Sequence, residues 1–411
     1  MVTASLADVR AWDAGDPLRP LRDAFELPDG VIYLDGNSLG AAPRVAAPRM
    51  QRAIAEEWAG GLVRSWNAHD LIGAPARVGS KIAPLVGAAP GEVIACDSTS
   101  VNLYKLLAAA LQRQAPRKVV LAEAGDFPTD LYVAQGVQRL MGGELRLAPA
   151  AALEVAIGAD VAVVMLTHVS YRSGARHDMA RINALAHDAG ALVIWDLSHS
   201  AGAMRIDLGG ADADLAVGCG YKYLNGGPGA PAWLFVAQRL QAELVSPLTG
   251  WMGHAAPFEF DGDYRPAEGI ERFLAGTPPI LSMLALECGV DLFAGVDLAA
   301  VEAKAQRLAD LFMARVEARC AGHGLTLVTP RASAARGSQV SFAHPHAYQV
   351  MQALIARGVI GDFRAPDILR CGFTPVYLGY EDVWRAVETL AEVLETGAWR
   401  DPRFAIRTRV T

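Results

Sequence analysis

The sequence predicts an α/β protein with a mostly parallel sheet flanked by helices, followed by a smaller α+β domain. Between residues 117 and 218, short runs rich in Val, Ile and Leu alternate with longer stretches of helical spacing. The runs are almost continuously apolar, as expected for parallel strands that are covered on both faces. Near Gly295 this alternation gives way to long amphipathic helical patterns. These three observations predict the fold class.

The alternation predicts individual elements in chain order. Strands are predicted at 117–122, 160–166, 191–196 and 214–218. Helices are predicted at 128–141, at 179–189 with Asp178 as N-cap, and at 103–111. After a helical stretch at 280–293, the pattern predicts helices at 298–320, 346–357 and 380–395, and strands at 325–328 and 339–342.

These changes of pattern predict three parts of the chain. Residues 46–285 form a large α/β domain and residues 286–411 a small α+β domain. Residues 1–45 fit neither pattern and contain no long periodic segment, so we expect them to pack on the small domain or on a partner chain.

Composition excludes several classes of protein. The chain has 411 residues, 37 basic and 44 acidic, and a net charge of −7. This charge and the absence of a Lys/Arg cluster argue against nucleic acid or an anionic membrane as partner. No apolar run reaches the ~18 residues of a membrane span, and three aspartates interrupt the first sixteen residues. We therefore expect a cytoplasmic protein.

The sequence offers no metal or dinucleotide motif. Its five cysteines are widely spaced without a C-x-x-C pair, so they are expected to be buried thiols. His344 and His346 flank a proline without a nearby third ligand, which favours a loop over a metal site. There is no G-x-G-x-x-G or P-loop pattern. We predict no bound metal.

Polar residues follow the predicted strands, where ligands collect in an open parallel sheet. Asp196 ends one strand, and Lys222 follows the next strand in a glycine-rich turn between two tyrosines. Taken singly, Asp196 reads as a turn cap and Lys222 as a surface lysine. An aspartate at a strand end with a lysine 26 residues later is what pyridoxal phosphate requires. The other four lysines are interpreted as solvated charges: Lys81, Lys105, Lys118 and Lys304.

Further strand ends supply groups for such a cofactor. Thr99 and Ser100 precede the helix at 103–111, where hydroxyls and free backbone N–H groups suit a phosphate, although an ordinary N-cap fits equally well. The loop 125–130 offers the ring of Phe127 and the carboxylate of Asp130, or is an ordinary proline-containing loop. Thr167 follows the strand at 160–166.

Together these residues resemble the kynureninase family. The resemblance rests on Asp196-x-x-His199, Tyr221-Lys222, the Asp-Phe-Pro-Thr-Asp segment and Thr99-Ser100, and it extends to residues 33–40, 171–174, 250–253, 273–278 and 369–373. It implies an aspartate-aminotransferase-like fold of type I with a seven-stranded sheet, and a homodimer with shared active sites.

The resemblance also implies a role for each site residue. Lys222 would bind the cofactor covalently and shuttle the substrate's α-proton, and Asp196 would hold the ring N–H. Tyr221 would act in the proton transfers. The remaining cofactor contacts would be Thr99, Ser100, Phe127, Pro128, Thr129, Asp130, Thr167 and His199, with Trp251 of the partner subunit and Thr277 of the partner subunit. Arg370 would bind the substrate α-carboxylate, and Asn37 and Trp66 would contact the substrate.

The implied activity is hydrolysis of L-kynurenine to anthranilate and L-alanine, in tryptophan catabolism and NAD biosynthesis. Acceptance of 3-hydroxykynurenine stays open, and the small pair Gly276-Thr277 favours plain kynurenine. One alternative is another lyase or transaminase of the same fold, such as a cysteine desulfurase, because Cys371 adjoins Arg370. A second alternative is a regulatory or scaffold protein that binds the cofactor without catalysis. The chain lacks the Ser/Gly-rich cysteine loop of the desulfurases, so a buried Cys371 thiol is expected.

Overall fold

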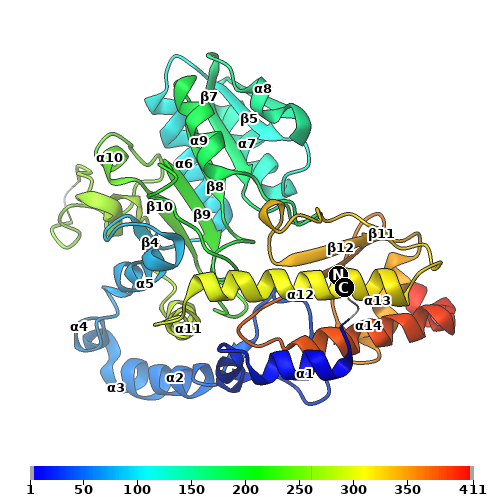
Figure 1. The fold of residues 1–411 in the computed structure, drawn as a ribbon. Helices are drawn as coiled ribbons and strands as arrows, with labels where there is room; N and C mark the ends of the chain where they lie inside the picture. The colour runs from blue at the N-terminus through cyan, green and yellow to red at the C-terminus, as the bar shows by residue number, and fades with distance from the viewer. Residues whose placement is uncertain (1–3, 261, 408–411) are drawn as a thin grey trace.

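A computed structural model describes residues 4–260 and 262–407, and its centre is a seven-stranded sheet (Figure 1). The strand order is β4 (Val93–Ala95), β10 (Ala232–Val236), β9 (Leu215–Cys219), β8 (Leu192–Asp196), β7 (Val161–Thr167), β5 (Val119–Glu123) and β6 (Glu144–Ala148). Only β10 runs antiparallel to its neighbours, so the prediction of a mostly parallel sheet is confirmed.

Helices cover both faces of this sheet. On one face, α6 (Thr99–Arg113) and α7 (Pro128–Met141) pack with one alternate set of strand side chains, including Val163. On the other face, α5 (Ala74–Ile82) and α9 (Met179–Asp188) pack with the opposite set, including Val164. Burial on both faces explains why the central strands are apolar throughout.

The predicted strands and helices of this domain are found within two residues, with one larger difference. Helix α6 begins at Thr99, four residues before the predicted start, because the Ser98 side chain accepts a hydrogen bond from the Val101 N–H and caps the helix there. Strands β4, β6 and β10 were not recognised individually, since β4 has only three residues and β6 is a largely exposed edge strand.

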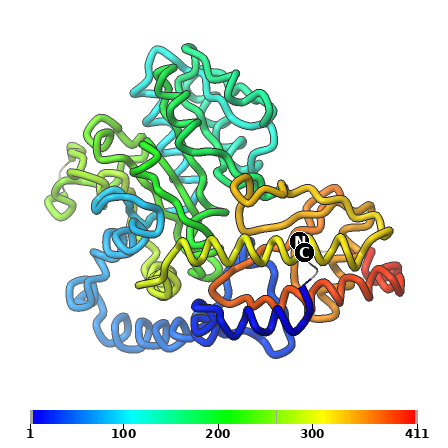
Figure 2. Tube along the Cα trace, in the orientation of Figure 1, coloured from blue at the N-terminus to red at the C-terminus, as the bar shows by residue number. Residues whose placement is uncertain are grey.

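The C-terminal part contains a second, antiparallel sheet of four strands. Its order is β11 (Thr326–Leu327), β12 (Gln339–Ala343), β15 (Ile368–Gly372) and β14 (Asp362–Arg364). The helices around it are α12 (Leu298–Arg319), α13 (Ala347–Ile355) and α14 (Tyr380–Glu395), and α11 (Ile280–Asp291) precedes them. Figure 2 shows the N-terminal helical segment, residues 6–14, lying beside this part.

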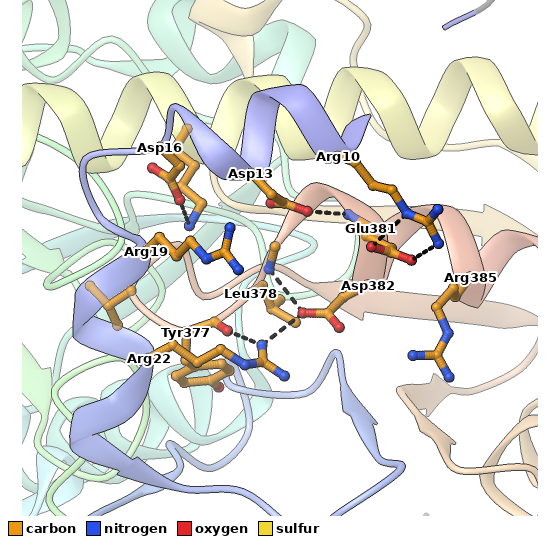
Figure 3. A pocket seen from close by; sticks show the side chains of 13 residues that line it. Arg10, Asp13, Asp16, Arg19, Arg22, Tyr377, Leu378, Glu381, Asp382 and Arg385 are labelled. Atoms are coloured by element: carbon orange, nitrogen blue, oxygen red, sulfur yellow. Dashed lines mark hydrogen bonds and ion pairs between the residues drawn. The ribbon is translucent and has the colours of Figure 1, made fainter. Parts of the chain in front are cut away.

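The N-terminal residues contain a helix that the sequence did not reveal, α1 (Leu6–Ala14). Asp13, near its end, accepts hydrogen bonds from the backbone N–H groups of Tyr380 and Glu381 and so caps α14 (Figure 3). Arg10 pairs with Glu381 nearby. Residues 1–45 therefore contact the C-terminal part, while the domain boundaries at 45 and 285 stay predictions.

Shorter elements complete the described chain. The N-terminal strand β2 (Ile32–Tyr33) pairs in parallel with β13 (Val359–Ile360). The remaining ones are β1 (Phe25–Glu26), β3 (Ala42–Pro43), α2 (Ala46–Arg52), α3 (Ala59–Gly61), α4 (Ser65–Ala68), α8 (Leu153–Ala156) and α10 (Gln238–Gln241).

Replacing Asp13 by alanine is expected to lower the free energy of unfolding by about 1 kcal/mol, because the first N–H groups of α14 lose their cap. Thermal unfolding checks this, with a decrease of a few degrees expected. Asp13→Asn keeps one acceptor oxygen for the two N–H groups and should recover only part of the loss. Equal unfolding temperatures for Asp13→Ala and the unmodified chain would contradict the capping role.

Two lysines interpreted as solvated charges are buried, and that prediction was wrong. Lys105 has 0% exposed side-chain area and pairs with Asp97 at 2.6 Å. Lys304 is buried against Asp16, with an Nζ–Oδ2 distance of 2.6 Å. Asp97 lies in the turn before the helix of Lys105, and Asp16 comes from the N-terminal residues, so helical spacing alone did not reveal the burial.

The expectation that the cysteines are buried thiols is confirmed. All five cysteines are free and buried. Within residues 4–260 and 262–407, no group of three or more His, Cys, Asp or Glu side chains is placed to hold a metal ion. Among these same residues, no helix combines the length and apolarity needed to cross a bilayer.

Candidate active site

The carboxyl ends of the central strands meet where the sequence placed the polar residues. Asp196 is the last residue of β8, and its carboxylate accepts hydrogen bonds from the Ser198 N–H at 2.8 Å and from the Ser198 hydroxyl at 2.6 Å. Thr167 ends the neighbouring strand β7, and β9 ends three residues before Lys222. The parallel arrangement of β7, β8 and β9 brings these ends together.

Lys222 lies half-buried in the turn after β9, among aromatic and imidazole groups. Its Nζ lies 2.9 Å from His199 Nε2 and 5.7 Å from the centre of the Phe127 ring. The Tyr221 ring centre is 5.9 Å from the same nitrogen. The structure thus brings together Lys222, Tyr221, His199 and Phe127.

Two buried carboxyl groups form the floor of this site. Asp130, in the first turn of α7, hydrogen-bonds to Asp196 through their carboxyl groups. Burial, followed by the charge of Asp196, raises the pKa of Asp130 well above its usual range. Two adjacent buried carboxyl groups cannot both carry a negative charge unless a proton or a cation between them compensates it. A protonated pyridine nitrogen supplies both, so the pair fits the ring of pyridoxal phosphate.

Asp130→Asn is expected to stabilise the cofactor-free protein at pH 8. Because folding raises this pKa above its ordinary value of 3.8, the stability contribution of the protonated carboxyl is complete below about pH 4 and decreases as pH rises. Asparagine removes that dependence, so we expect a melting temperature about 2–4 °C higher at pH 8 and little change near pH 4. Differential scanning fluorimetry over this range checks it, and a lower melting temperature at pH 8 would contradict it.

Two hydroxyl groups lie at the start of α6. Thr99 and Ser100 are the first two helical residues, half-buried, directly after the Ser98 cap. Lys105, further along α6, donates hydrogen bonds to the Asp97 carboxylate and to the Phe273 carbonyl. These bonds fix the turn before the helix. Hydroxyls at a helix N-terminus match a phosphate, so these residues also fit the predicted cofactor.

Arg370, on β15, is fully buried next to the site. Its guanidinium donates to the Tyr171 carbonyl at 2.7 Å, to the Ser38 hydroxyl at 2.8 Å, and to the Asp362 carboxylate. Its Nε–H has no hydrogen-bond partner within the described residues, and Asn37 Oδ1 is a second buried polar atom of this kind. Such groups are available to a bound carboxylate.

Three predicted site residues have no contact with this cluster in the described part of one chain. Trp66 packs with Leu71 and Leu284 in a separate apolar cluster. Trp251 is 37% exposed with its ring edge-on to Phe258, and Thr277 is exposed. Their roles stay predictions.

Sequence analysis missed several residues that complete the site. Ser38 and Asp362 orient Arg370, and Gln339 hydrogen-bonds to His199 at 3.0 Å. Gln339 carried the only local signal, since it is a polar residue at the start of an otherwise apolar predicted strand. Ser38 and Asp362 gave no such signal, because their contacts to Arg370 depend on strand pairing in the C-terminal sheet and on the placement of the N-terminal residues.

Gly40 closes the site from the N-terminal side and is expected to tolerate no side chain. Its N–H donates to the Tyr221 carbonyl at 2.8 Å, and an added Cβ would lie 2.3 Å from the Lys222 carbonyl oxygen. Gly40→Ala should therefore displace the Lys222 turn and lower kcat/KM at least about tenfold. Steady-state kinetics test this against Gly136→Ala, where no atom lies within 4 Å of the added carbon. Equal activity of both variants would contradict the prediction.

Comparison with known proteins agrees with this geometry. A family model described as the kynureninase C-terminal domain matches residues 301–390. The kynureninase of Burkholderia pseudomallei (strain 1106a) is 56% identical over 408 residues, which cover 98% of both chains. The kynureninase of Pseudomonas fluorescens is 52% identical, covering 98% of this chain and 99% of its own.

The chain belongs to the kynureninase family.

Solved structures extend this likeness to the fold. A cysteine desulfurase from Thermococcus onnurineus NA1 matches with a TM-score of 0.77 at 20% identity, covering 92% of this chain and 98% of its own. A C-DES mutant with glycine covalently linked to the PLP cofactor matches with a TM-score of 0.77 at 18% identity, covering 90% and 99%. At these identities the structures confirm the fold class, while the kynureninases establish the family.

Proposed function

We propose that this chain hydrolyses the Cβ–Cγ bond of L-kynurenine to anthranilate and L-alanine, with pyridoxal phosphate as cofactor. One observation carries the proposal in this member of the kynureninase family. The Lys222 amine lies 2.9 Å from the buried His199, close to the end of β8. There Asp196 forms a carboxyl pair with Asp130 of α7. These groups fit the amine-binding aldehyde and the basic ring nitrogen of the cofactor.

Different described residues would bind different groups of the cofactor. Lys222 would bind its aldehyde, Asp196 its ring nitrogen, and Thr99 and Ser100 its phosphate, with Phe127 against the ring. Pro128, Thr129, Asp130, Thr167, His199 and Tyr221 would surround it. When bound, the cofactor withdraws electrons from the substrate's α-carbon and so makes its proton acidic.

The chain's own groups then orient the substrate and move protons. Arg370 would hold the α-carboxylate through its unpartnered Nε–H. Lys222 would remove the α-proton. Burial raises the pKa of the Tyr221 hydroxyl above its usual range, so this group stays protonated at neutral pH and can donate a proton during cleavage.

Product analysis tests the proposal. Purified protein, pyridoxal phosphate and L-kynurenine should give anthranilate and alanine in equal amounts, followed by anthranilate fluorescence and amino-acid analysis. The same assay with 3-hydroxykynurenine measures which of the two substrates is cleaved faster, and we expect it to be unsubstituted kynurenine. Bound cofactor with no anthranilate formed would overturn the proposal.

The alternative activity of a cysteine desulfurase is supported by the fold alone. A desulfurase needs a reactive thiol near the substrate. Burial raises the pKa of the Cys371 thiol to about 12, and the other four cysteines are buried as well. Sulfide release from L-cysteine is therefore expected to be negligible beside kynurenine cleavage.

A homodimer with shared active sites is part of the proposal. Exposed apolar residues lie along residues 45–63, namely Val45, Ile54, Trp58, Leu62 and Val63, and others lie near Trp251, namely Phe258 and Phe260. Such patches are typical of interfaces. Trp251 of the partner subunit and Thr277 of the partner subunit would then complete the phosphate site, and Trp66 and Asn37 would contact the substrate.

Subunit mixing tests the shared site. Lys222→Ala and Trp251→Ala homodimers should be nearly inactive, whereas mixed dimers should regain activity at one of their two sites. No recovery after verified subunit exchange would contradict sharing.

We also propose a cytoplasmic location, which the five free thiols support because they suit a reducing compartment. The proposed reaction would serve tryptophan catabolism and NAD biosynthesis.

A further inference from the structure

Gln339, the first residue of β12, is 1% exposed and reaches from the C-terminal sheet into the site. Its Nε2 donates to the backbone carbonyls of Ser170 at 3.1 Å and Tyr171 at 3.0 Å. Its Oε1 lies 3.0 Å from His199 Nδ1 and accepts a longer hydrogen bond from Asn37 at 3.4 Å. All four contacts use one buried amide.

The two carbonyls determine which way this amide points. A flipped amide would place Oε1 against two carbonyl oxygens, leaving three oxygen acceptors together without a proton. Oε1 therefore faces His199, and an oxygen at that position can only accept. The proton on His199 must consequently lie on Nδ1.

This assignment decides what His199 presents to Lys222. With Nδ1–H donating to Gln339, Nε2 carries a lone pair directed at Lys222 Nζ, 2.9 Å away. Burial, followed by the charges of Lys222 and Arg370, lowers the pKa of His199 well below its usual range, so the ring is neutral. A neutral ring that only accepts favours the protonated form of the lysine nitrogen.

We propose that Gln339 is a positioning residue that fixes the Nδ1–H tautomer of His199 and thereby favours a protonated Lys222 nitrogen. The inference deepens the proposed function and rests on it for the role of Lys222. Because β12 belongs to the C-terminal sheet, this contact lets the placement of one domain set the protonation of an amine in the other.

Other charged and titratable groups act on the same pair without contacting Nδ1. They come from every element packed against it: Asp130 on α7, Asp196 on β8, Cys219 and Tyr221 at the end of β9, Arg364 on β14 and Arg370 on β15. Beyond burial, the charges of Lys222, Arg370 and Arg364 lower the pKa of His199. Of the described residues, only Gln339 has a hydrogen bond to Nδ1 of His199.

The test is a pH titration of the holoenzyme's cofactor absorbance without kynurenine, which reports protonation of the Lys222 nitrogen. Gln339→Met keeps the side chain's approximate size but frees His199 to place its proton on Nε2, facing the lysine. We expect the pH midpoint to decrease by about one unit and kcat to decrease about 10–100-fold. Gln241→Met is the matched control, because Gln241 also donates to two backbone carbonyls, at 2.9 and 3.0 Å, but lies on α10.

A second variant distinguishes an effect of Gln339 on the His199 tautomer from a loss of packing around Gln339. In a His199→Asn protein there is no ring to orient, so adding Gln339→Met should leave the midpoint unchanged. Gln339→Leu also removes the acceptor oxygen, so its midpoint should likewise decrease, and it serves if the methionine variant does not fold. An unchanged midpoint in folded Gln339→Met, or the same shift in the His199→Asn background, would overturn the proposal. A holoenzyme that shows the shift but releases no anthranilate would instead overturn the proposed function.

Discussion

Replacing Lys222 by methionine is expected to lower kcat for kynurenine cleavage by at least about 10⁴-fold, because it removes the group that binds the cofactor and moves the α-proton. The buried His199 beside it has no primary amine with which to bind the cofactor aldehyde, so it cannot replace Lys222. Anthranilate release measures the loss, and borohydride reduction followed by peptide mapping should no longer label this segment.

Lys118→Met is the control for this variant. Lys118 is exposed and donates to the Met141 carbonyl at 2.9 Å, so its replacement should leave kcat within about twofold of the unmodified chain. Borohydride label on another lysine of the unmodified protein would contradict the assignment and, with it, the proposed chemistry.

Arg370→Leu is expected to have the second largest effect, raising KM about 10–100-fold through loss of a charge-assisted hydrogen bond to the substrate carboxylate. It should also destabilise the protein by about 3 kcal/mol, because the buried Asp362 carboxylate loses one partner and retains Arg364 and Ser38. Kinetics and chemical denaturation measure the two effects separately.

Arg364→Leu separates substrate binding from support of Asp362. Arg364 pairs with the same carboxylate at 2.6 Å, but its side chain is 36% exposed. We expect a smaller stability loss and a KM within a few-fold of the unmodified chain. An equal increase of KM in both arginine variants would contradict the assignment of Arg370 as the residue that binds the substrate carboxylate.

Much of the large domain could be predicted locally. Strands β5, β7, β8 and β9 are buried on both faces, so their sequences carry a continuous apolar signal, and helices α7 and α14 were predicted to the residue. Helix α1 was missed because its nine residues have only Val9 fully buried. Its place depends on caps and ion pairs with α14, which lies more than 360 residues away.

The candidate site divides in the same way. Asp196, Lys222, Thr99 and Arg370 could be chosen from the sequence because each follows or lies in a recognisable element, and their combination resembles a family. The burial of Lys105 against the Phe273 carbonyl and the roles of Ser38 and Asp362 could not be predicted, because each depends on a partner from another segment.

The sequence by itself determined the chemical identity of the site: a strand-end carboxylate, an amine in the following turn and a guanidinium on a later strand. The alternation of apolar runs shows where each parallel strand ends, and these ends lie at one edge of the sheet. Locating them requires no information on contacts between distant residues. Only the tertiary structure decided the protonation of the groups around the carboxylate and the amine. Burial, followed by the charge of Asp196, raises the pKa of Asp130, and an amide from the second domain orients His199 toward Lys222. Protonation follows from burial and from through-space partners, which no local pattern of residues encodes.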